Sequence, residues 1–153
     1  MKKFSFPLML LLMTSCGGHL VKEFTDIPML VWERDNVLSF PVDIPDDKQK
    51  YEMTFALRHS SLYPYSTIKI RFKITLPNKE IYEVVKSFEL REEGGMWKAG
   101  CMGDLCDVEF PTDITFDTPG YHTVLLSHEM LPEDLALVFE AGIIVDAMEE
   151  VAE

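Results

Sequence analysis

The sequence predicts an all-β protein that folds as a single antiparallel β-sandwich of about seven to eight strands, either a jelly roll or immunoglobulin-like. Short segments in which apolar and polar residues alternate recur at intervals of about 8–12 residues, with turn residues between them. No segment keeps a helical periodicity for long enough to form a core helix. The 153 residues suffice for one domain with a hydrophobic core.

The predicted strands of the first half start at residues 37–42, where Pro41 lacks an N–H and therefore indicates an edge strand. Alternation is clear again over residues 51–58. The strongest signal is a hairpin in which residues 67–76 pair with residues 81–90 across a Pro-Asn turn. The residues expected to point from this hairpin into the core are Ile68, Ile70, Phe72 and Ile74.

The second half of the chain predicts shorter elements. Residues 91–107 are rich in glycine and are expected to form a loop. Residues 131–135 predict a corner or a single helical turn, and Gly142 indicates a bulge or a close approach within the last strand. The strands expected here are residues 108–110, 114–116, 120–127 and 138–146.

The N-terminal segment predicts export and lipidation rather than a membrane-spanning helix. Two lysines precede an apolar run at positions 4–13, and Thr14 and Ser15 come directly before Cys16. Ten helical residues rise only about 15 Å, about half the thickness of the hydrocarbon core of a bilayer. This order is typical of a bacterial lipoprotein signal, so we expect cleavage before Cys16 and lipid on Cys16. The alternative is an ordinary signal peptide that happens to contain a cysteine.

The predicted layout of the chain therefore has three parts. They are a lipoprotein signal peptide over residues 1–15, a lipidated flexible tether over residues 16–23 and a β-sandwich domain over residues 24–153. The chain carries 14 Lys and Arg against 26 Asp and Glu, a formal net charge of −12. Such a protein is a poor match for nucleic acid. It is also not attracted to anionic lipid, so the lipid anchor must supply the membrane contact.

Cys101 and Cys106 are predicted to form a disulfide, because an exported protein meets an oxidising compartment and Cys16 is used by the lipid. A zinc site that joins these two cysteines to His122 and His128 is the alternative, although the histidines are loosely spaced. The sequence shows no G-x-S-x-G elbow, phosphate-binding glycine loop or dinucleotide fingerprint. We therefore expect no catalytic residue, no cofactor and no metal.

Arg58, Tyr63, Tyr65 and Trp97 are the candidate residues for protein docking. Tyrosine, tryptophan and arginine are enriched at protein interfaces, where aromatic rings supply large and stiff contact areas. Pro64 lies between the two tyrosines and restricts their loop. In the alternative interpretation, a tyrosine closes the edge of the core and the proline fixes a turn.

Several short motifs follow one another in an order that resembles a known family, the gliding motility lipoprotein GldH family of the Bacteroidetes. The likeness runs from Trp32 to Asp146 and includes the lipoprotein signal. The sequence departs from the family at His59 and Thr67, where asparagine is expected, and in its pair of late cysteines. The motifs are Leu57-Arg58, Tyr63-Pro64-Tyr65-Ser66, Gly95-x-Trp97 followed by Gly100 and Gly103, then Tyr121, Met130, Leu135 and Ala141-Gly142-Ile143.

The resemblance implies a non-catalytic cell-envelope lipoprotein, associated with gliding motility and the type IX secretion apparatus, that acts through contacts with envelope proteins. Surface-exported lipoproteins of the Bacteroidetes usually carry acidic residues directly after the lipidated cysteine. Here the first acids are Glu23 and Asp26, which favours a periplasm-facing position at the outer membrane. The alternative function is a carbohydrate- or ligand-binding module of an outer-membrane uptake system, with Trp97 as its candidate platform. An enzyme ranks below both, because no nucleophile–base pair is visible.

Overall fold

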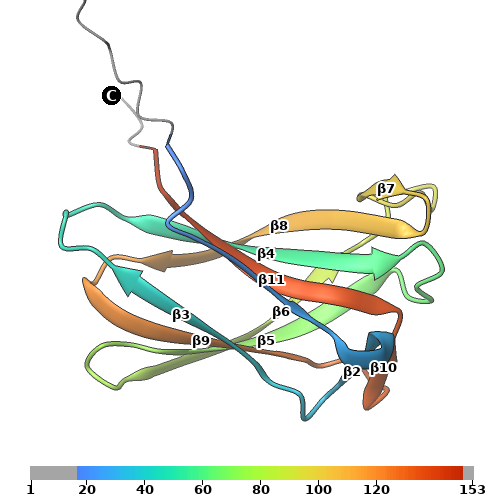
Figure 1. Cartoon of the computed structure of the whole chain (residues 1–153), viewed down its shortest axis with the longest axis horizontal. Helices are drawn as coiled ribbons and strands as arrows, with labels where there is room; N and C mark the ends of the chain where they lie inside the picture. Colours follow the sequence, from blue (N-terminus) through green and yellow to red (C-terminus); the bar gives the residue numbers. More distant parts are fainter. Residues whose placement is uncertain (1–16, 150–153) are drawn as a thin grey trace, which may run out of the picture.

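Two antiparallel sheets built from eight long strands face each other in the computed structural model, which describes residues 17–149 (Figure 1). A third, two-stranded sheet closes one end. The strands of the first sheet, in spatial order, are β1 (Val21–Asp26), β11 (Val138–Ala147), β4 (Tyr51–Ser60), β8 (Leu105–Phe116) and the short β7 (Gly100–Met102). The second sheet contains β3 (Leu38–Ile44), β9 (Gly120–His128), β5 (Thr67–Thr75) and β6 (Ile81–Glu89), and the small sheet pairs β10 (Asp134–Ala136) with β2 (Val31–Glu33).

The pairing of the eight long strands has the pattern of a jelly roll. The first long strand pairs with the last, β1 with β11, and the second with the seventh, β3 with β9. The third pairs with the sixth, β4 with β8, and the fourth with the fifth, β5 with β6. The chain thus folds as one long hairpin that is rolled into two sheets. The prediction of an antiparallel β-sandwich is confirmed, and of its two suggested types the jelly roll is the one found.

The core lies between the two sheets and is dominated by aromatic and branched side chains. The predicted core face of β5 is confirmed, because Ile68, Ile70, Phe72 and Ile74 are all buried. Phe55 of β4 packs edge-on against Phe72, with ring centroids 6.1 Å apart. These contacts join the two sheets directly, since β4 and β5 belong to different ones.

The N-terminal segment differs from the expected tether. Residues 21–26 form β1 and pair with β11 from Val21↔Val145 to Asp26↔Glu140. Even before this strand, the Leu20 N–H donates to the Val145 carbonyl at 2.9 Å, and the imidazole of His19 lies 2.6 Å from the carboxylate of Asp146. The segment is therefore held to the sheet from His19 onward, and of the expected tether only Gly17 and Gly18 among the described residues lie outside these contacts.

Three other expectations need correction. The glycine-rich segment over residues 91–107 contains β7 and the start of β8, which form a hairpin. The two short strands expected at 108–110 and 114–116 are one strand, interrupted by a register shift opposite Met53 and Thr54. The corner at residues 131–135 leads into β10 rather than a helical turn, because Leu135 pairs with Trp32.

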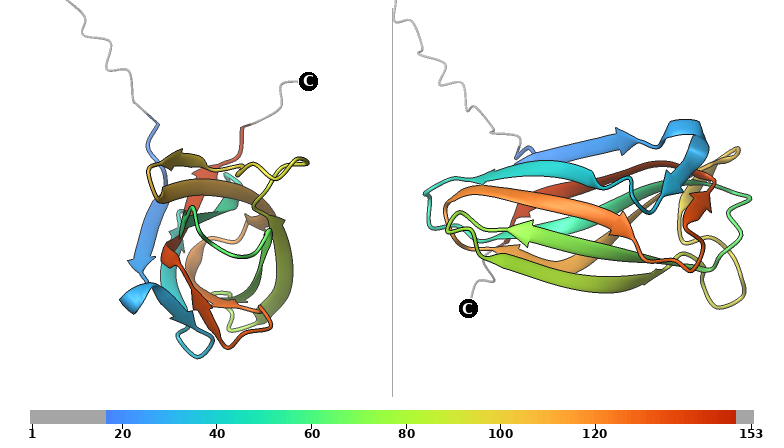
Figure 2. Two further views of the ribbon diagram at one scale, coloured as in Figure 1. Left: turned by 90° about the vertical axis from the view of Figure 1, so that its right-hand side faces the viewer. Right: turned by 90° about the horizontal axis from the view of Figure 1, so that it is seen from below.

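The sandwich has two distinct ends. The described chain starts and stops at the left in Figure 1, where His19 meets Asp146; we call this the tether end. The loops at residues 27–37, 60–67, 89–104 and 128–137 gather at the opposite end, which we call the distal end and which faces the viewer in the left panel of Figure 2. A ten-residue strand such as β4 spans about 33 Å and thus separates the two ends.

Candidate protein-docking site

The loops of the distal end are tied together by one carboxylate, that of Asp104. Its side chain accepts hydrogen bonds from the hydroxyls of Ser60, at 2.8 Å, and Ser61, at 2.6 Å, and its backbone carbonyl accepts one from the Ser61 N–H. The hydroxyls of Ser61 and Ser60 hold the pKa of the Asp104 carboxyl below its ordinary value, because they bind the charged form. The hairpin β7–β8 is therefore fixed to the end of β4.

A disulfide joins Cys101 of β7 to Cys106 of β8. The two cysteines are directly opposite each other in the strand register, with their Cα atoms 4.0 Å apart. Gly103 makes the turn between them with a φ of 63°, in the left-handed region that glycine adopts at little cost. The bond closes the same hairpin that Asp104 fixes to β4.

Trp97, in the loop before β7, also contacts the end of β4. Its indole N–H donates to the Ser61 carbonyl at 3.2 Å, and the guanidinium of Arg91 lies over its ring, 3.5 Å from the ring centroid. Arg91 and Trp97 also form an isolated backbone bridge. The indole is thus half-buried and covered by a cation rather than presented as an open platform for a sugar ring.

The structure places the two candidate tyrosines differently from the expectation. Tyr63 is only 1% exposed and belongs to the core, so it cannot offer contact area to a partner, and its expected exposure is wrong. The physical reason is that its ring packs against His59 and Tyr65, with centroids 5.6 Å away in both cases. Burial raises the pKa of the Tyr63 phenol. Tyr65 is half-buried and keeps part of its ring at the surface.

Arg58 is not part of this cluster. Successive residues of a strand point to opposite faces, and Arg58 lies on the outer face of the first sheet, while its neighbour His59 points inward. Its guanidinium contacts Asp107 at 2.6 Å and Glu140 at 3.1 Å, one from each neighbouring strand. The hydrogen bond to Asp107 raises the pKa of Arg58. The side chain is thus engaged within its own sheet.

His59 is fully buried between Tyr63 and Trp97. Its Nδ1 donates to the Ser60 carbonyl at 2.8 Å, whereas its Nε2 is buried without a hydrogen-bond partner. Burial lowers the pKa of the imidazole, and the nearby charge of Arg91 lowers it further. The imidazole contacts the backbone of Ser60 and not its hydroxyl, so this pair does not have the geometry of a base and a nucleophile.

The most exposed apolar side chains of the described chain were missed from the sequence. Five large apolar residues of the distal loops are more exposed than any at the tether end, where Tyr121 reaches 60%. No periodicity marks them, because four lie between the strands and Met102 ends the three-residue β7. The only signal in the sequence is the presence of Met and Leu in segments that predict turns. They are Met29 at 91%, Leu62 at 73%, Met96 at 75%, Met102 at 86% and Leu131 at 98%.

The zinc alternative does not fit this arrangement. Cys101 and Cys106 are bonded to each other, while His122 and His128 lie six residues apart on β9. His128 uses both ring nitrogens within the chain, toward the Glu133 carbonyl and the Met130 N–H. Across residues 17–149, no group of three or more His, Cys, Asp or Glu residues has the geometry of a metal site.

The sequence model of the GldH lipoprotein family matches residues 19–145, which include every strand except the last residues of β11. The chain belongs to the GldH lipoprotein family. Membership in this lipoprotein family makes the protein a membrane-anchored component of the cell envelope. Cys16, the expected lipidation site, lies outside the described residues. Within residues 17–149, no helix is both long and apolar enough to cross a bilayer.

Neither the search of curated proteins nor the search of solved structures found a match for this member of the GldH lipoprotein family.

Proposed function

We propose that this lipoprotein is a non-catalytic envelope component that binds protein partners through its distal end, while lipid on Cys16 holds the tether end at the outer membrane, facing the periplasm. The observation that carries the proposal is the position of the exposed apolar residues. The five most exposed ones all lie at the distal end, opposite the tether end. Exposed apolar groups gathered on one face are typical of interaction sites, and methionine adapts well to a partner surface.

The backbone of the distal end supports this proposal. Met29 and Leu30 adopt φ values of 56° and 58°, in the left-handed region that costs a residue with a side chain about 1–3 kcal/mol. Met29 lies at this turn between β1 and β2 and is 91% exposed. Strained backbone that displays an apolar side chain to solvent is expected where the side chain has a function.

The rigid frame behind the loops supports it as well. The disulfide, the Asp104 hydrogen bonds and the Arg91–Trp97 stack fix the loop positions before a partner arrives. A preorganised surface loses less conformational entropy on binding. The role expected from the family resemblance, in the gliding and type IX secretion machinery, is included in this proposal, with partners drawn from the proteins of that apparatus.

Site-specific photo-crosslinking in intact cells tests the proposal. A photoreactive residue at Leu62 or Met102 should crosslink to discrete envelope proteins, whereas one at Tyr121, which is also exposed but lies at the tether end, should not. Replacing Leu62 and Met102 together with serine should reduce crosslinks from Met29, because the partner loses part of its contact area. Equal crosslinking from Leu62 and Tyr121, or none from any distal position, would contradict a distal docking surface.

A further inference from the structure

The edges of the two sheets are unequal. An edge strand offers unpaired backbone groups to any extended chain, and proteins usually block such edges with prolines, bulges or short strands. β3 contains Pro41, β8 contains Pro111 and a register shift, and β7 has three residues. β6 has no proline and no register shift, and its nine residues pair with β5 without interruption, from Ile81↔Thr75 to Glu89↔Thr67. Of the usual protections it carries an inward-facing lysine, Lys86.

The free side of β6 runs along β8 without pairing with it (Figure 2). Toward the distal end this seam between the sheets is closed by side chains, because Phe88 of β6 stacks on Phe110 of β8 with ring centroids 5.0 Å apart. Toward the tether end the seam is open. There Tyr82 remains 48% exposed, although its register opposite the buried Ile74 places it on the inner face.

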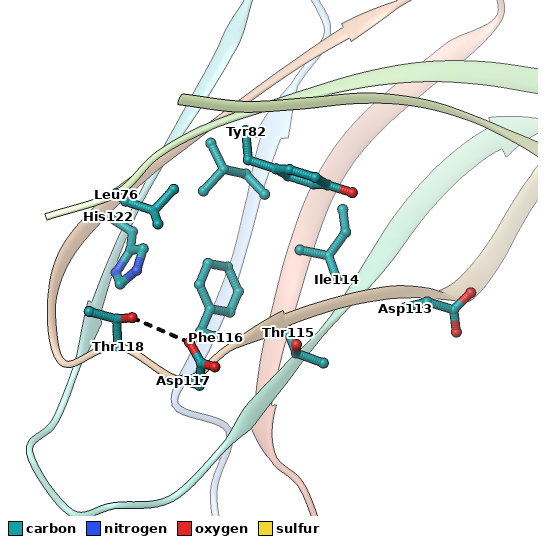
Figure 3. Close-up of a pocket in the computed structure, with 10 residues that line it drawn as sticks. Leu76, Tyr82, Asp113, Ile114, Thr115, Phe116, Asp117, Thr118 and His122 are labelled. Carbon is teal, nitrogen blue, oxygen red and sulfur yellow. Dashed lines mark hydrogen bonds between the residues drawn. The ribbon is translucent and has the colours of Figure 1, made fainter. Parts of the chain in front are cut away.

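The open half of the seam contains a cavity of about 320 Å³ (Figure 3). Its walls are apolar and come from both sheets: Ile74 and Tyr82 on one side, Ile114 and Phe116 on the other. Its polar rim includes the carboxylates of Asp113 and Asp117, and no lysine or arginine lines it. The cavity therefore favours an apolar side chain with a cation close by.

We propose that β6 docks an extended segment of a partner protein, which adds to the second sheet by antiparallel strand pairing, places an apolar side chain in the cavity beside Tyr82 and carries Lys or Arg next to it. In strand addition, backbone hydrogen bonds supply affinity, and pockets for alternate side chains supply specificity. Every second residue of β6 directs its N–H and C=O to the free side. On the outer face the segment also covers Val85, which is 46% exposed.

Charge decides between a partner and a second copy of this chain as the occupant. The chain carries a net charge of −12, so two copies repel each other when their edges approach. On β6 itself, Glu83 is already paired with Arg71, and Lys86 lies on the inner face in the middle of the strand. An inward-facing lysine is a known protection of edges against uncontrolled pairing. The remaining carboxylates at the rim of the cavity attract a basic segment.

Binding of synthetic peptides to the detergent-solubilised full-length lipoprotein tests the proposal. The probe is a nine-residue peptide in which valine and lysine alternate, and its control replaces lysine with glutamate. We expect the lysine peptide to bind about tenfold more tightly than the glutamate peptide and to slow amide hydrogen exchange in β6. Two N-methylated versions, each lacking alternate N–H groups, should differ: one should lose binding and the other should keep it, since only one set faces the edge.

Two matched variants locate the site. Val85→Lys should weaken the lysine peptide about tenfold or more, whereas Val37→Lys, at a distal valine of similar exposure, should leave its affinity unchanged. Asp113→Asn combined with Asp117→Asn should reduce the preference for lysine over glutamate. Thermal unfolding of each variant verifies that the fold is kept.

Three results would overturn the inference: equal effects of Val85→Lys and Val37→Lys, equal binding of the two N-methylated peptides, or a dimer in sedimentation that Val85→Lys dissociates. The last result would assign the edge to a second copy. None of them affects crosslinking from Leu62, so the distal docking surface stands or falls separately.

Discussion

Gly142 of β11 lies directly against the backbone of β1, opposite Phe24 in the strand register. A Cβ at position 142 would stand 2.9 Å from the Phe24 Cα and would also collide with the Glu23 carbonyl oxygen. Since backbone atoms cannot swing aside as a flexible side chain does, Gly142 lets β1 approach β11 at a distance that other residues forbid.

We therefore predict that Gly142→Ala loosens β1 from the sheet and lowers the free energy of unfolding by about 2 kcal/mol or more. Chemical denaturation measures the loss of stability. Relative to the unchanged protein, amide hydrogen exchange should accelerate more in residues 21–26 than in β5. Gly100→Ala is the matched control, because a Cβ at Gly100 meets no atom within 4 Å. Similar losses in the two variants would show that close packing at Gly142 is not the cause.

A second prediction concerns acid sensitivity at His59. Burial lowers its pKa, as it does that of His128, so the folded protein binds fewer protons than the unfolded chain below about pH 6.5. The free energy that the buried, uncharged imidazole contributes to stability is therefore fully present above the ordinary pKa of histidine. It is lost as the pH falls toward the lowered pKa of the folded state. The free energy of unfolding should therefore decrease between pH 7 and pH 5.

His59→Phe should make this decrease shallower, because phenylalanine keeps the ring contacts with Tyr63 and Trp97 but takes up no proton. It also removes the buried Nε2 that has no partner. Denaturation curves at several pH values give the slope, which matters here more than the stability at any one pH. Part of the pH dependence should persist in His59→Phe, because His128 still takes up a proton. A slope identical to that of the unchanged protein would contradict the assignment to His59.

The hairpin β5–β6 and the core face of β5 could be predicted because strict alternation of apolar and polar residues is a direct consequence of a strand with one buried face. β1 could not. Its residues Val21–Asp26 lie at a sheet edge with most side chains exposed, so they carry little alternation. Their pairing with β11 depends on the missing side chain of Gly142, over a hundred residues later in the chain. The sequence signalled that position as a close approach, but not its partner.

The candidate site was predicted only in part, and for a related reason. Residue type indicated that Tyr63, Tyr65 and Trp97 would gather, and they do. Residue type cannot tell on which side of the core boundary a ring lies. Tyr63 lies inside it because the loop that follows β4 packs its ring against His59, four residues earlier near the end of that strand. The exposed Met29 and Leu131 show no periodicity in the sequence, since their exposure depends on loops that the strand order brings to one end.

A third prediction concerns the disulfide between Cys101 and Cys106. Replacing both cysteines with serine should lower the free energy of unfolding by only about 2 kcal/mol, because the loop that the bond closes is short. The larger effect should be local. The disulfide closes the hairpin that contains Asp104, and the carboxylate of Asp104 accepts a hydrogen bond from the Ser61 hydroxyl. The Ser61 carbonyl in turn accepts a hydrogen bond from the indole N–H of Trp97.

Iodide quenching of tryptophan fluorescence measures this local effect, since Trp32 is fully buried and quenching reports on Trp97. Quenching should increase in the double serine variant. Asp104→Asn, which keeps the disulfide but weakens the bonds to the serine hydroxyls, should give an intermediate increase. If quenching is unchanged while stability falls by several kcal/mol, the bond serves the whole domain rather than the Trp97 loop.

The last prediction concerns the membrane anchor. The sequence predicts lipid on Cys16, and the chain is held to the sheet from His19 onward through Asp146 and the Val145 carbonyl. Only Gly17 and Gly18 then separate Cys16 from the folded domain, a span of at most about 10 Å. The acidic chain has no electrostatic attraction to anionic lipid, so its retention at the membrane depends on the acyl chains alone.

Cys16→Ala should therefore move the protein from the membrane fraction into the soluble fraction, whereas the double serine variant of Cys101 and Cys106 should remain with the membrane. Sedimentation of Cys16→Ala with membranes after a high-salt wash would show that something other than lipid on this residue holds the domain in place.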